Sequence, residues 1–380
     1  MKLAFISLME GFAWGGSEEL WSKVANEALQ NNNKVIINVL EWPEIHPKHK
    51  MLINKGAQFY FRKKIHSNNF ILKVVSKIFP FISFKKKDTV WNWIENEKPD
   101  SICISMGGPY DCIYHPGLMY LIQNLNIPYF IIQQFNFENS VLNNQHRKAA
   151  KKIFEDCRKI FFVSNRNMET VKRNIVSKLE NFEIVSNPIN LKNSEIEPYP
   201  SVNDNFNFAV VARLDVYYKG QDMLIQTLAS EVWKNRNWIL NFYGSGPDID
   251  YLEELILFYG LEKKVFLKGS SDDIREVWKS NHLLILPSFA EGTPLALIEA
   301  MHCGRTAVVT NVGGNAELID DNVNGFIAES NNIKYLNHAL NRAWDRRIEW
   351  ADLGILARNK VLKKVDLNSH RKIYLELSGA

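Results

Sequence analysis

Short apolar runs alternate with amphipathic stretches along the 380 residues of this chain. Apolar runs of this length predict buried strands, and their alternation with helical periodicity predicts parallel sheets covered by helices. A first series of strands is expected near 2–8, 34–40, 57–61, 101–105, 129–134, 159–163 and 182–186. A second series is expected near 206–212, 238–243, 265–268, 283–287, 307–310 and 325–328. The pattern therefore predicts an α/β protein with two doubly wound domains.

A polar segment with two prolines separates the two series. We expect an N-terminal domain at residues 1–190, a hinge at 191–205 and a C-terminal domain at 206–364. Each domain is then of ordinary size for an independent core.

Composition favours a globular protein of a reducing compartment. Apolar residues make up 46% of the chain and charged residues 23%, as in typical globular domains. The four cysteines lack paired metal-site spacing, so we expect buried free thiols. The apolar start, Leu3–Met9, has only one basic residue before it, Lys2, and no small-residue cleavage site of a signal peptide after it. We therefore expect a cytoplasmic protein.

One segment is strongly basic. Residues 45–87 contain eleven Lys or Arg and no acid, together with many Phe and Ile. This pattern is typical of a surface for anionic lipid or a lipid-pyrophosphate acceptor. The alternative, equally open, is that the apolar residues pack in a core while the lysines are merely solvated. Nucleic acid is disfavoured as a partner, because no recognised binding motif surrounds the cluster and the C-terminal half is acidic.

A helix start after the apolar run 283–287 is the first candidate for chemistry. Thr293 suits the N-cap, and Pro294 suits the first helical position. Helix-forming residues continue to Cys303, and Gly304 is a plausible end.

Two glutamates flank this helix start. Glu291 precedes it and Glu299 lies in its second turn. The free N–H groups of Leu295 and Ala296 would form an anion site at the positive end of the helix dipole. A diphosphate could bind there, with one carboxylate accepting hydroxyl hydrogen bonds on each side. The alternative is a capped surface helix with two solvated acids.

A pair of cations follows an earlier strand. Arg213 and Lys219 lie six residues apart after an apolar run, at a strand end where ligands collect in open α/β sheets. Both suit phosphate oxygens, Arg as a planar fork and Lys as a compact charge. Solvated cations near strand ends are common, so this pair is weak evidence by itself.

The order of these motifs resembles the donor half of retaining GT-B glycosyltransferases, most closely family 4, the glycosyl transferases group 1. The matching residues are Arg213, Lys219-Gly220, Tyr243–Pro247, Gly269, the Glu291-x7-Glu299 stretch, Val312–Gly314, Glu317 and Asn324-Gly325. The N-terminal half adds Gly15-Gly16, Phe162–Ser164 and Ser186–Pro188. The resemblance implies a GT-B fold: two Rossmann-like domains face across a cleft, and a terminal helix, about 365–380, crosses back to the acceptor-binding N-terminal domain.

The resemblance also implies roles for individual residues. Arg213 and Lys219 would hold the donor diphosphate and stabilise its charge as it leaves. Glu291, the third catalytic position, would contact the donor sugar, and Glu299 would bind the ribose. The remaining donor-binding positions would be Gly16, Gly244, Gly292, Thr293, Pro294, Leu295 and Ala296.

The acceptor side departs from the family pattern. Many members carry a His where this chain has Gln134, and the preceding strand also ends without a His. Glutamine can hydrogen-bond a sugar hydroxyl but cannot titrate, so an acid–base role at this position is in doubt. We expect Gln134 and Asn136 on the acceptor side.

The resemblance implies a retaining, hexosyltransferase-type enzyme that needs no metal or other cofactor. It would move a sugar from a nucleotide-diphosphate donor, with UDP favoured, to a hydroxyl of a glycan or lipid-linked acceptor, in cell-surface polysaccharide or glycolipid synthesis. Two alternatives stay open: a nucleotide-sugar-binding protein of this fold without transfer, and a nucleotide-sugar epimerase. Peripheral contact with the inner face of the plasma membrane is expected if the basic segment binds lipid.

Overall fold

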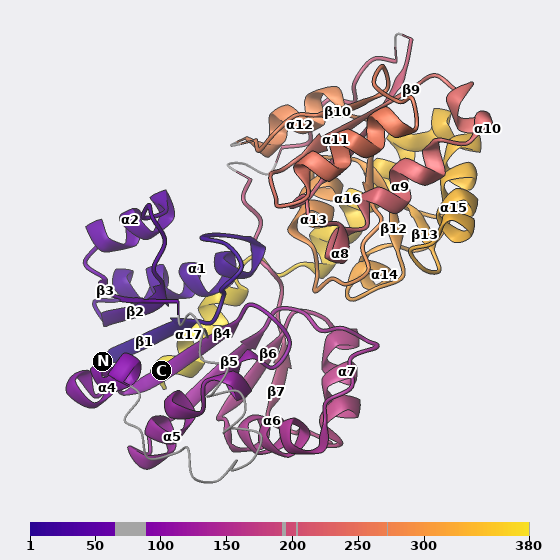
Figure 1. The fold of residues 1–380 in the computed structure, drawn as a ribbon. Helices are drawn as coiled ribbons and strands as arrows, with labels where there is room; N and C mark the ends of the chain where they lie inside the picture. Colours follow the sequence, from indigo (N-terminus) through magenta and orange to yellow (C-terminus); the bar gives the residue numbers. More distant parts are fainter. Residues whose placement is uncertain (65–88, 192–194, 203, 272, 380) are drawn as a thin grey trace. The chain divides into compact units, whose positions relative to one another are not determined.

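The computed structural model describes residues 1–64, 89–191, 195–202, 204–271 and 273–379. They form two compact units (Figure 1). The first comprises Met1–Val185 and Asn368–Ala380, and the second comprises Ser186–Leu367. Residues 65–87 of the predicted basic segment lie outside the described residues.

The first unit is a parallel sheet between two layers of helices. Its strand order is β3-β2-β1-β4-β5-β6-β7. The strands are β1 Lys2–Ser7, β2 Lys34–Leu40, β3 Gln58–Arg62, β4 Ser101–Met106, β5 Tyr129–Gln133, β6 Lys159–Phe162 and β7 Phe182–Ile184. The helices are α1 Gly16–Gln30, α2 Pro47–Asn54, α4 Asn92–Glu97, α5 Pro116–Asn124, α6 Asn144–Asp156, α7 Asn165–Ile175 and α17 Ser369–Ser378, with short 3-10 turns at Thr89–Trp91 and Asp111–Tyr114.

Both faces of this sheet are buried because successive side chains alternate between them. In β1, Phe5 packs in the cluster that contains residues of α1 and α17, and Ile6 packs in the opposite cluster with residues of α4 to α7. The C-terminal helix α17 is held to this unit by Ser101, whose hydroxyl donates to the Leu377 carbonyl (2.9 Å). The chain thus returns to its first unit at the C-terminus, as the resemblance implied.

The second unit repeats this architecture with the strand order β10-β9-β8-β11-β12-β13. The strands are β8 Phe206–Val211, β9 Trp238–Tyr243, β10 Val265–Leu267, β11 Leu283–Leu286, β12 Thr306–Thr310 and β13 Phe326–Ala328. The helices are α8 Val216–Lys219, α9 Gln221–Leu228, α10 Glu231–Lys234, α11 Ile249–Phe258, α12 Ile274–Ser280, α13 Leu295–His302, α14 Asn315–Leu318, α15 Ile333–Asp345 and α16 Trp350–Lys364, with a 3-10 turn at Arg347–Glu349.

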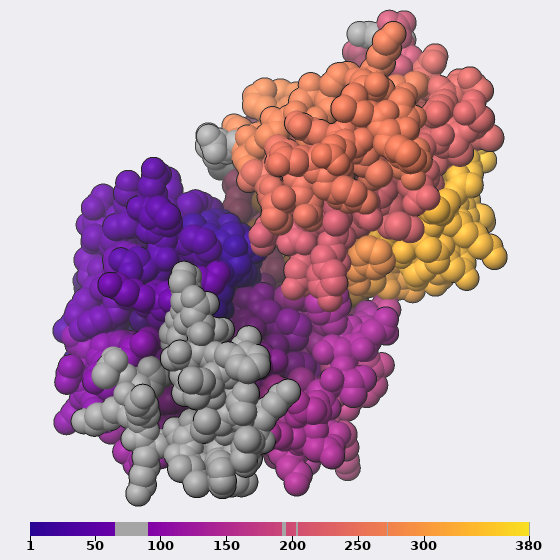
Figure 2. All heavy atoms as spheres, viewed as in Figure 1, coloured from indigo at the N-terminus to yellow at the C-terminus, as the bar shows by residue number. Residues whose placement is uncertain are grey.

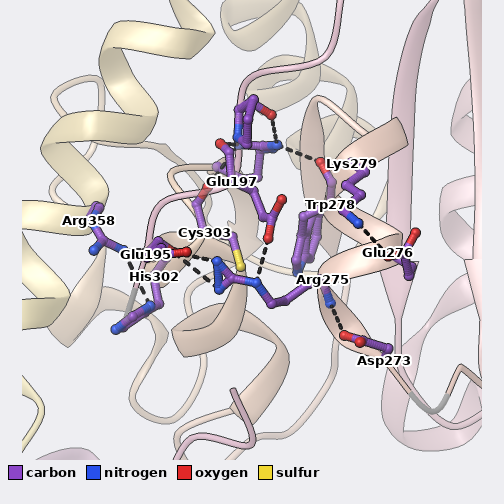
Figure 3. A network of polar contacts seen from close by, with 12 residues as sticks. Glu195, Glu197, Asp273, Arg275, Glu276, Trp278, Lys279, His302, Cys303 and Arg358 are labelled. Atoms are coloured by element: carbon purple, nitrogen blue, oxygen red, sulfur yellow. Dashed lines mark hydrogen bonds and ion pairs between the residues drawn. The ribbon is translucent and has the colours of Figure 1, made fainter. Parts of the chain in front are cut away.

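A buried arginine fastens the segment near residues 195–198, part of the expected hinge, to the second unit. The Arg305 guanidinium is fully buried and donates to the main-chain carbonyls of Glu197, Pro198, Trp278, Asn281 and Cys303. Arg275 of α12 forms an ion pair with Glu197 and also donates to the Glu195 carbonyl (Figure 3). This part of the segment therefore packs as an integral element of the second unit.

The predicted fold class is confirmed. Every strand expected from the apolar runs is present, with ends that differ by no more than two residues. Both sheets are parallel and doubly wound. Among the described residues, no helix combines the length and apolarity needed to cross a membrane.

Candidate functional site

The donor-half residues gather where the second sheet changes winding direction. The strand order reverses between neighbours β8 and β11, and open α/β sheets bind ligands outside the carboxyl ends of such strands. The chain leaving β8 carries Arg213 and Lys219, and the chain leaving β11 carries Glu291. The two segments are tied together by the Phe289 N–H, which donates to the Tyr218 carbonyl (2.9 Å).

Lys219 and Glu291 form the polar centre of this arrangement. The Lys219 Nζ lies 2.6 Å from Glu291 Oε1, and the Ser288 hydroxyl donates to the same oxygen (2.7 Å). The Glu291 side chain is 7% exposed and that of Lys219 is 24% exposed. The carboxylate is therefore fixed in position, while part of the Lys219 side chain remains open to solvent.

Arg213 lies on the same loop as Lys219. Its guanidinium is 3.7 Å from Asp215, and its carbonyl accepts a hydrogen bond from the Gln221 side chain (2.6 Å). After Arg213 the chain forms the single turn α8, which includes Lys219. Gly220 caps this turn with a left-handed φ of 61°. Gly220 permits the sharp exit that starts α9 directly behind Lys219.

The helix start predicted at Thr293 is displaced by one residue, and this prediction was wrong. Pro294 is the N-cap of α13, because its carbonyl accepts the first helical hydrogen bond, from Leu297 (3.1 Å). The Thr293 carbonyl instead accepts from the side chain of Asn187 (3.0 Å). α13 ends at His302 with Cys303 as its C-cap, and Gly304 follows with φ 77°, as expected for the residue after the cap. Leu295 and Ala296 still occupy the first helical positions, where N–H groups lack helical partners.

Two glycines permit close packing around the site. Gly313 has φ 50°, and a Cβ there would lie 2.1 Å from the Glu291 carbonyl oxygen. The neighbouring Gly314 N–H donates to the Gly292 carbonyl (2.5 Å). Gly244, at the exit of β9, has φ 150°, and its Cβ would lie 2.0 Å from the Ala212 carbonyl oxygen. Side chains at Gly244 and Gly313 would push apart the loops that hold Arg213 and Glu291.

Glu299 lies on the buried side of α13 and is 6% exposed. One of its carboxylate oxygens accepts from the Asn190 main-chain N–H (3.3 Å). Together with Asn187, this contact places the segment that follows Ser186 against the start of α13. Glu299 therefore holds this segment against α13.

The other predicted residues belong to the first unit. Gly16 is the first residue of α1, after β1, and Gln134 and Asn136 follow β5. Gln134 is 5% exposed and Asn136 is 2% exposed. Within the described part of the chain, the Gln134 Nε2 has no hydrogen-bond partner. A buried donor of this kind is rare in native proteins unless water or a ligand satisfies it.

A buried charged network near Gly16 was missed by sequence reasoning. Glu18 accepts from the Ser7 hydroxyl (2.9 Å), and the Arg62 guanidinium donates to the Ser7 carbonyl (3.0 Å). Burial raises the pKa of Glu18 to about 7 and that of nearby Asp111 to about 6. Burial also lowers the pKa of His115 to about 4. Ser7 and Arg62 end β1 and β3, which only the sheet order brings together, so spacing gave no signal.

Ser288 and Asn187 were also not predicted as site residues. Asn187 belongs to the Ser186–Pro188 motif that supported the resemblance, and that motif was the available signal. Ser288 carries no distinguishing pattern, and only the fold places it beside Glu291.

Part of the chain matches a known protein family. Residues 192–360 match the family model described as "Glycosyl transferases group 1". The UDP-Gal:alpha-D-GlcNAc-diphosphoundecaprenol alpha-1,3-galactosyltransferase of Escherichia coli is 33% identical over 115 residues, 28% of this chain and 29% of that protein. The poly(ribitol-phosphate) alpha-N-acetylglucosaminyltransferase of Staphylococcus aureus is 27% identical over 252 residues, 66% of this chain and 50% of that protein. The chain thus spans no more than half the length of these two relatives.

A solved structure matches the whole chain. The crystal structure of Anabaena HepE in complex with UDP and glucose aligns with a TM-score of 0.73 at 17% identity, covering 100% of both chains. Similarity at this identity establishes the fold alone. Most of the second unit is thus similar to the glycosyl transferases group 1, and the chain has the GT-B fold.

Proposed function

We propose that the protein is a retaining glycosyltransferase of family 4 that transfers a sugar from a UDP-sugar to a hydroxyl of a glycan or lipid-linked acceptor. The observation that carries the proposal is that Lys219 pairs with Glu291 at the switch point of the second sheet, where the segments that carry Arg213 and the start of α13 also leave β8 and β11. The arrangement combines cations, helix N–H groups and a fixed carboxylate, which are the groups a sugar diphosphate requires.

In this proposal the diphosphate binds between the two cations and the first N–H groups of α13. Arg213 and Lys219 stabilise the negative charge that grows on the leaving phosphate as the bond to the sugar breaks. They supply positive charge without a metal ion, which makes metal-independent transfer part of the proposal. Binding requires the Lys219 ammonium to shift from Glu291 toward the phosphate or to be shared between them, which its partial exposure permits.

In this proposal the two carboxylates bind different parts of the donor. Glu291, fixed by Ser288 and Lys219, accepts hydrogen bonds from sugar hydroxyls, and Glu299 accepts them from the ribose. Gly292, Thr293 and the start of α13 shape the pocket wall, and Gly244 keeps the neighbouring loop close.

We assign the acceptor to the first unit. Gly16 offers backbone without a side chain to the donor phosphates, and the buried Gln134 Nε2 and Asn136 offer hydrogen bonds to the acceptor. The acceptor oxygen forms its bond to the sugar on the face from which the diphosphate leaves, and its proton passes to a phosphate oxygen. No protein nucleophile is needed for this route.

UDP and a lipid-linked or polymeric acceptor are the favoured substrates. Support comes from the UDP complex of HepE and from the relatives named for UDP-galactose, diphosphoundecaprenol and poly(ribitol-phosphate) substrates. The basic segment adds support for a cytoplasmic enzyme in peripheral contact with a membrane. Helix α2, in the violet upper part of the first unit (Figures 1 and 2), exposes Met51 and Ile53 beside Lys50.

The test is a thermal-shift screen of UDP, GDP and ADP in EDTA, repeated with Mg²⁺ and with Mn²⁺. We expect UDP to stabilise the protein without metal, because a ligand at about a hundred times its Kd adds roughly 2.7 kcal/mol. The Lys219→Ala variant should lose this stabilisation. The control variant, Lys263→Ala, changes an exposed lysine further along the chain and should retain it. Binding that disappears in EDTA and returns with Mn²⁺ would refute metal independence.

A further inference from the structure

The loop between β1 and α1, residues 8–15, is held at both ends by the first turn of α1. At the loop's start, Glu18 accepts from the Ser7 hydroxyl (2.9 Å), and that hydroxyl in turn accepts from the Met9 N–H (3.2 Å). At its end, the indole of Trp14 donates to Glu19 (2.6 Å). Two neighbouring acids therefore fix opposite ends of one loop. Both acids also lie at the positive end of the helix dipole, which stabilises their charge.

The buried cation Arg62 holds the start of the same loop from the side of the sheet. Arg62, 3% exposed, donates to the Ser7 carbonyl (3.0 Å) and to the Asn38 side chain (2.6 Å). Its guanidinium thereby connects the carboxyl ends of β1, β2 and β3, the strands that carry Ser7, Asn38 and Arg62. Its plane also lies over the ring of Trp91 (5.4 Å), which leaves the guanidinium little freedom to turn.

The deep burial of this network indicates that its role goes beyond placing acidic groups at a helix N-terminus. Glu18 is 2% exposed, and a carboxyl group is seldom buried so deeply unless it is paired and hydrogen-bonded. A neutral residue at position 18 would be less costly to bury. What the carboxylate provides is a fixed acceptor for Ser7, and through Ser7 a fixed position for the Met9 N–H.

We propose that Glu18, acting through Ser7, and Arg62, acting on the Ser7 carbonyl, are positioning residues that hold the β1–α1 loop and Gly16 in the conformation that receives the donor phosphates. The inference rests on the proposed function for the phosphate contact of Gly16. The hold on the loop does not depend on that function. Neither positioning residue touches substrate.

The experiment compares Ser7→Ala, Glu18→Ala and Glu18→Gln in the full chain. Ser7→Ala removes the bridging hydroxyl and adds no bulk. Glu18→Gln retains a side-chain oxygen that accepts from Ser7, so it is the conservative rescue. Ser22→Ala is the matched control, because Ser22 lies on the same helix, is 7% exposed, and donates within that helix to the Glu19 carbonyl.

Two readouts are measured on each variant: hydrogen exchange of peptides covering residues 8–16, and kcat and KM for release of UDP from UDP-glucose, UDP-galactose and UDP-N-acetylglucosamine. We expect Ser7→Ala and Glu18→Ala to raise loop exchange about tenfold, while peptides from β2 stay unchanged. The same two variants should lower kcat about tenfold with little change in KM. Glu18→Gln and Ser22→Ala should resemble the wild type in both readouts.

The outcomes separate this inference from the proposed function. Unchanged loop exchange in Ser7→Ala and Glu18→Ala would overturn the positioning role whatever the activity. Raised exchange with unchanged kcat would overturn the link between this loop and the donor phosphates. A wild type that releases no UDP from any of the three sugars would refute the proposed function, while the exchange data would still report on the loop.

Discussion

Replacing Glu291 by Gln should separate nucleotide binding from sugar recognition. The substitution removes the charge that holds Lys219 at 2.6 Å but retains an oxygen that can accept from Ser288. Lys219 is then free to engage the diphosphate. UDP contains the diphosphate and ribose and lacks the sugar, so it should bind Glu291→Gln at least as tightly as the wild type.

The size of this effect follows from the burial of the pair. An exposed ion pair contributes about 0.2–1 kcal/mol, and Lys219 remains 24% exposed, so about 1 kcal/mol is a reasonable upper value. A gain of that size corresponds to roughly fivefold tighter UDP binding. For the UDP-sugar, loss of a charged acceptor of sugar hydroxyls should outweigh this gain, because such hydrogen bonds contribute about 1.5–3 kcal/mol each.

The assay is isothermal titration calorimetry with UDP and with UDP-glucose, in EDTA, on the wild type, Glu291→Gln and Glu299→Gln. Glu299→Gln is the matched control, because it is the other buried glutamate at this helix start and is assigned to the ribose. It should weaken UDP about tenfold. Equal losses of UDP affinity in the two variants would refute the assignment of the two carboxylates to different parts of the donor.

Three further predictions concern stability and the membrane. Arg305→Ala should lower the free energy of unfolding by roughly 3–5 kcal/mol, because five buried carbonyls lose their donor; urea unfolding measures it, and Arg305→Lys should lose less. Because the pKa of Glu18 is raised to about 7, its stabilising contribution is full below about pH 4.5 and is lost as pH rises to 7. The unfolding free energy of the wild type should therefore fall relative to Glu18→Gln by up to about 3 kcal/mol across that window. Changing Lys50, Lys63 and Lys64 to Glu should reduce co-sedimentation with anionic vesicles at low salt, since each basic residue near such a surface contributes about 1 kcal/mol.

Each of these predictions has a clear contrary result. An Arg305→Ala protein with unchanged unfolding would mean that the carbonyls find other partners. A pH-independent difference between the wild type and Glu18→Gln would contradict the raised pKa of Glu18. Wild-type sedimentation that is the same with neutral and anionic vesicles would remove the case for a lipid surface.

Much of the fold could be predicted from the sequence because buried parallel strands are apolar on both faces. Runs such as Leu283–Leu286 stand out for this reason, and their order in the chain restricts the topology to a few arrangements. The ends of helices were less predictable where residues distant in the sequence bind the backbone groups of the helix start. Thr293 has the chemistry of an N-cap, but its carbonyl is bound by Asn187, 106 positions away, and the helix starts one residue later.

The candidate site was predictable in its charges but not in its pairings. Arg213, Lys219 and Glu291 were predicted as site residues from the sequence, and the reversal between β8 and β11 places the segments that carry them at the same edge of the sheet. The contact between Lys219 and Glu291 depends on the conformation of the loops that carry them. The network of Glu18 and Arg62 depends on the neighbouring positions of three strands, which residue spacing does not reveal.

The most direct test of the central claim follows the anomeric configuration of the sugar that the enzyme releases. The full chain is incubated in EDTA with UDP-glucose, UDP-galactose or UDP-N-acetylglucosamine, with water as the acceptor, and proton NMR records the first anomer formed before mutarotation. We predict UDP release from at least one donor with the α configuration retained, reduced by about 10²–10³ in both Arg213→Ala and Lys219→Ala. A β product, interconversion of UDP-glucose and UDP-galactose, free UDP-N-acetylmannosamine or binding without release would contradict a retaining transferase.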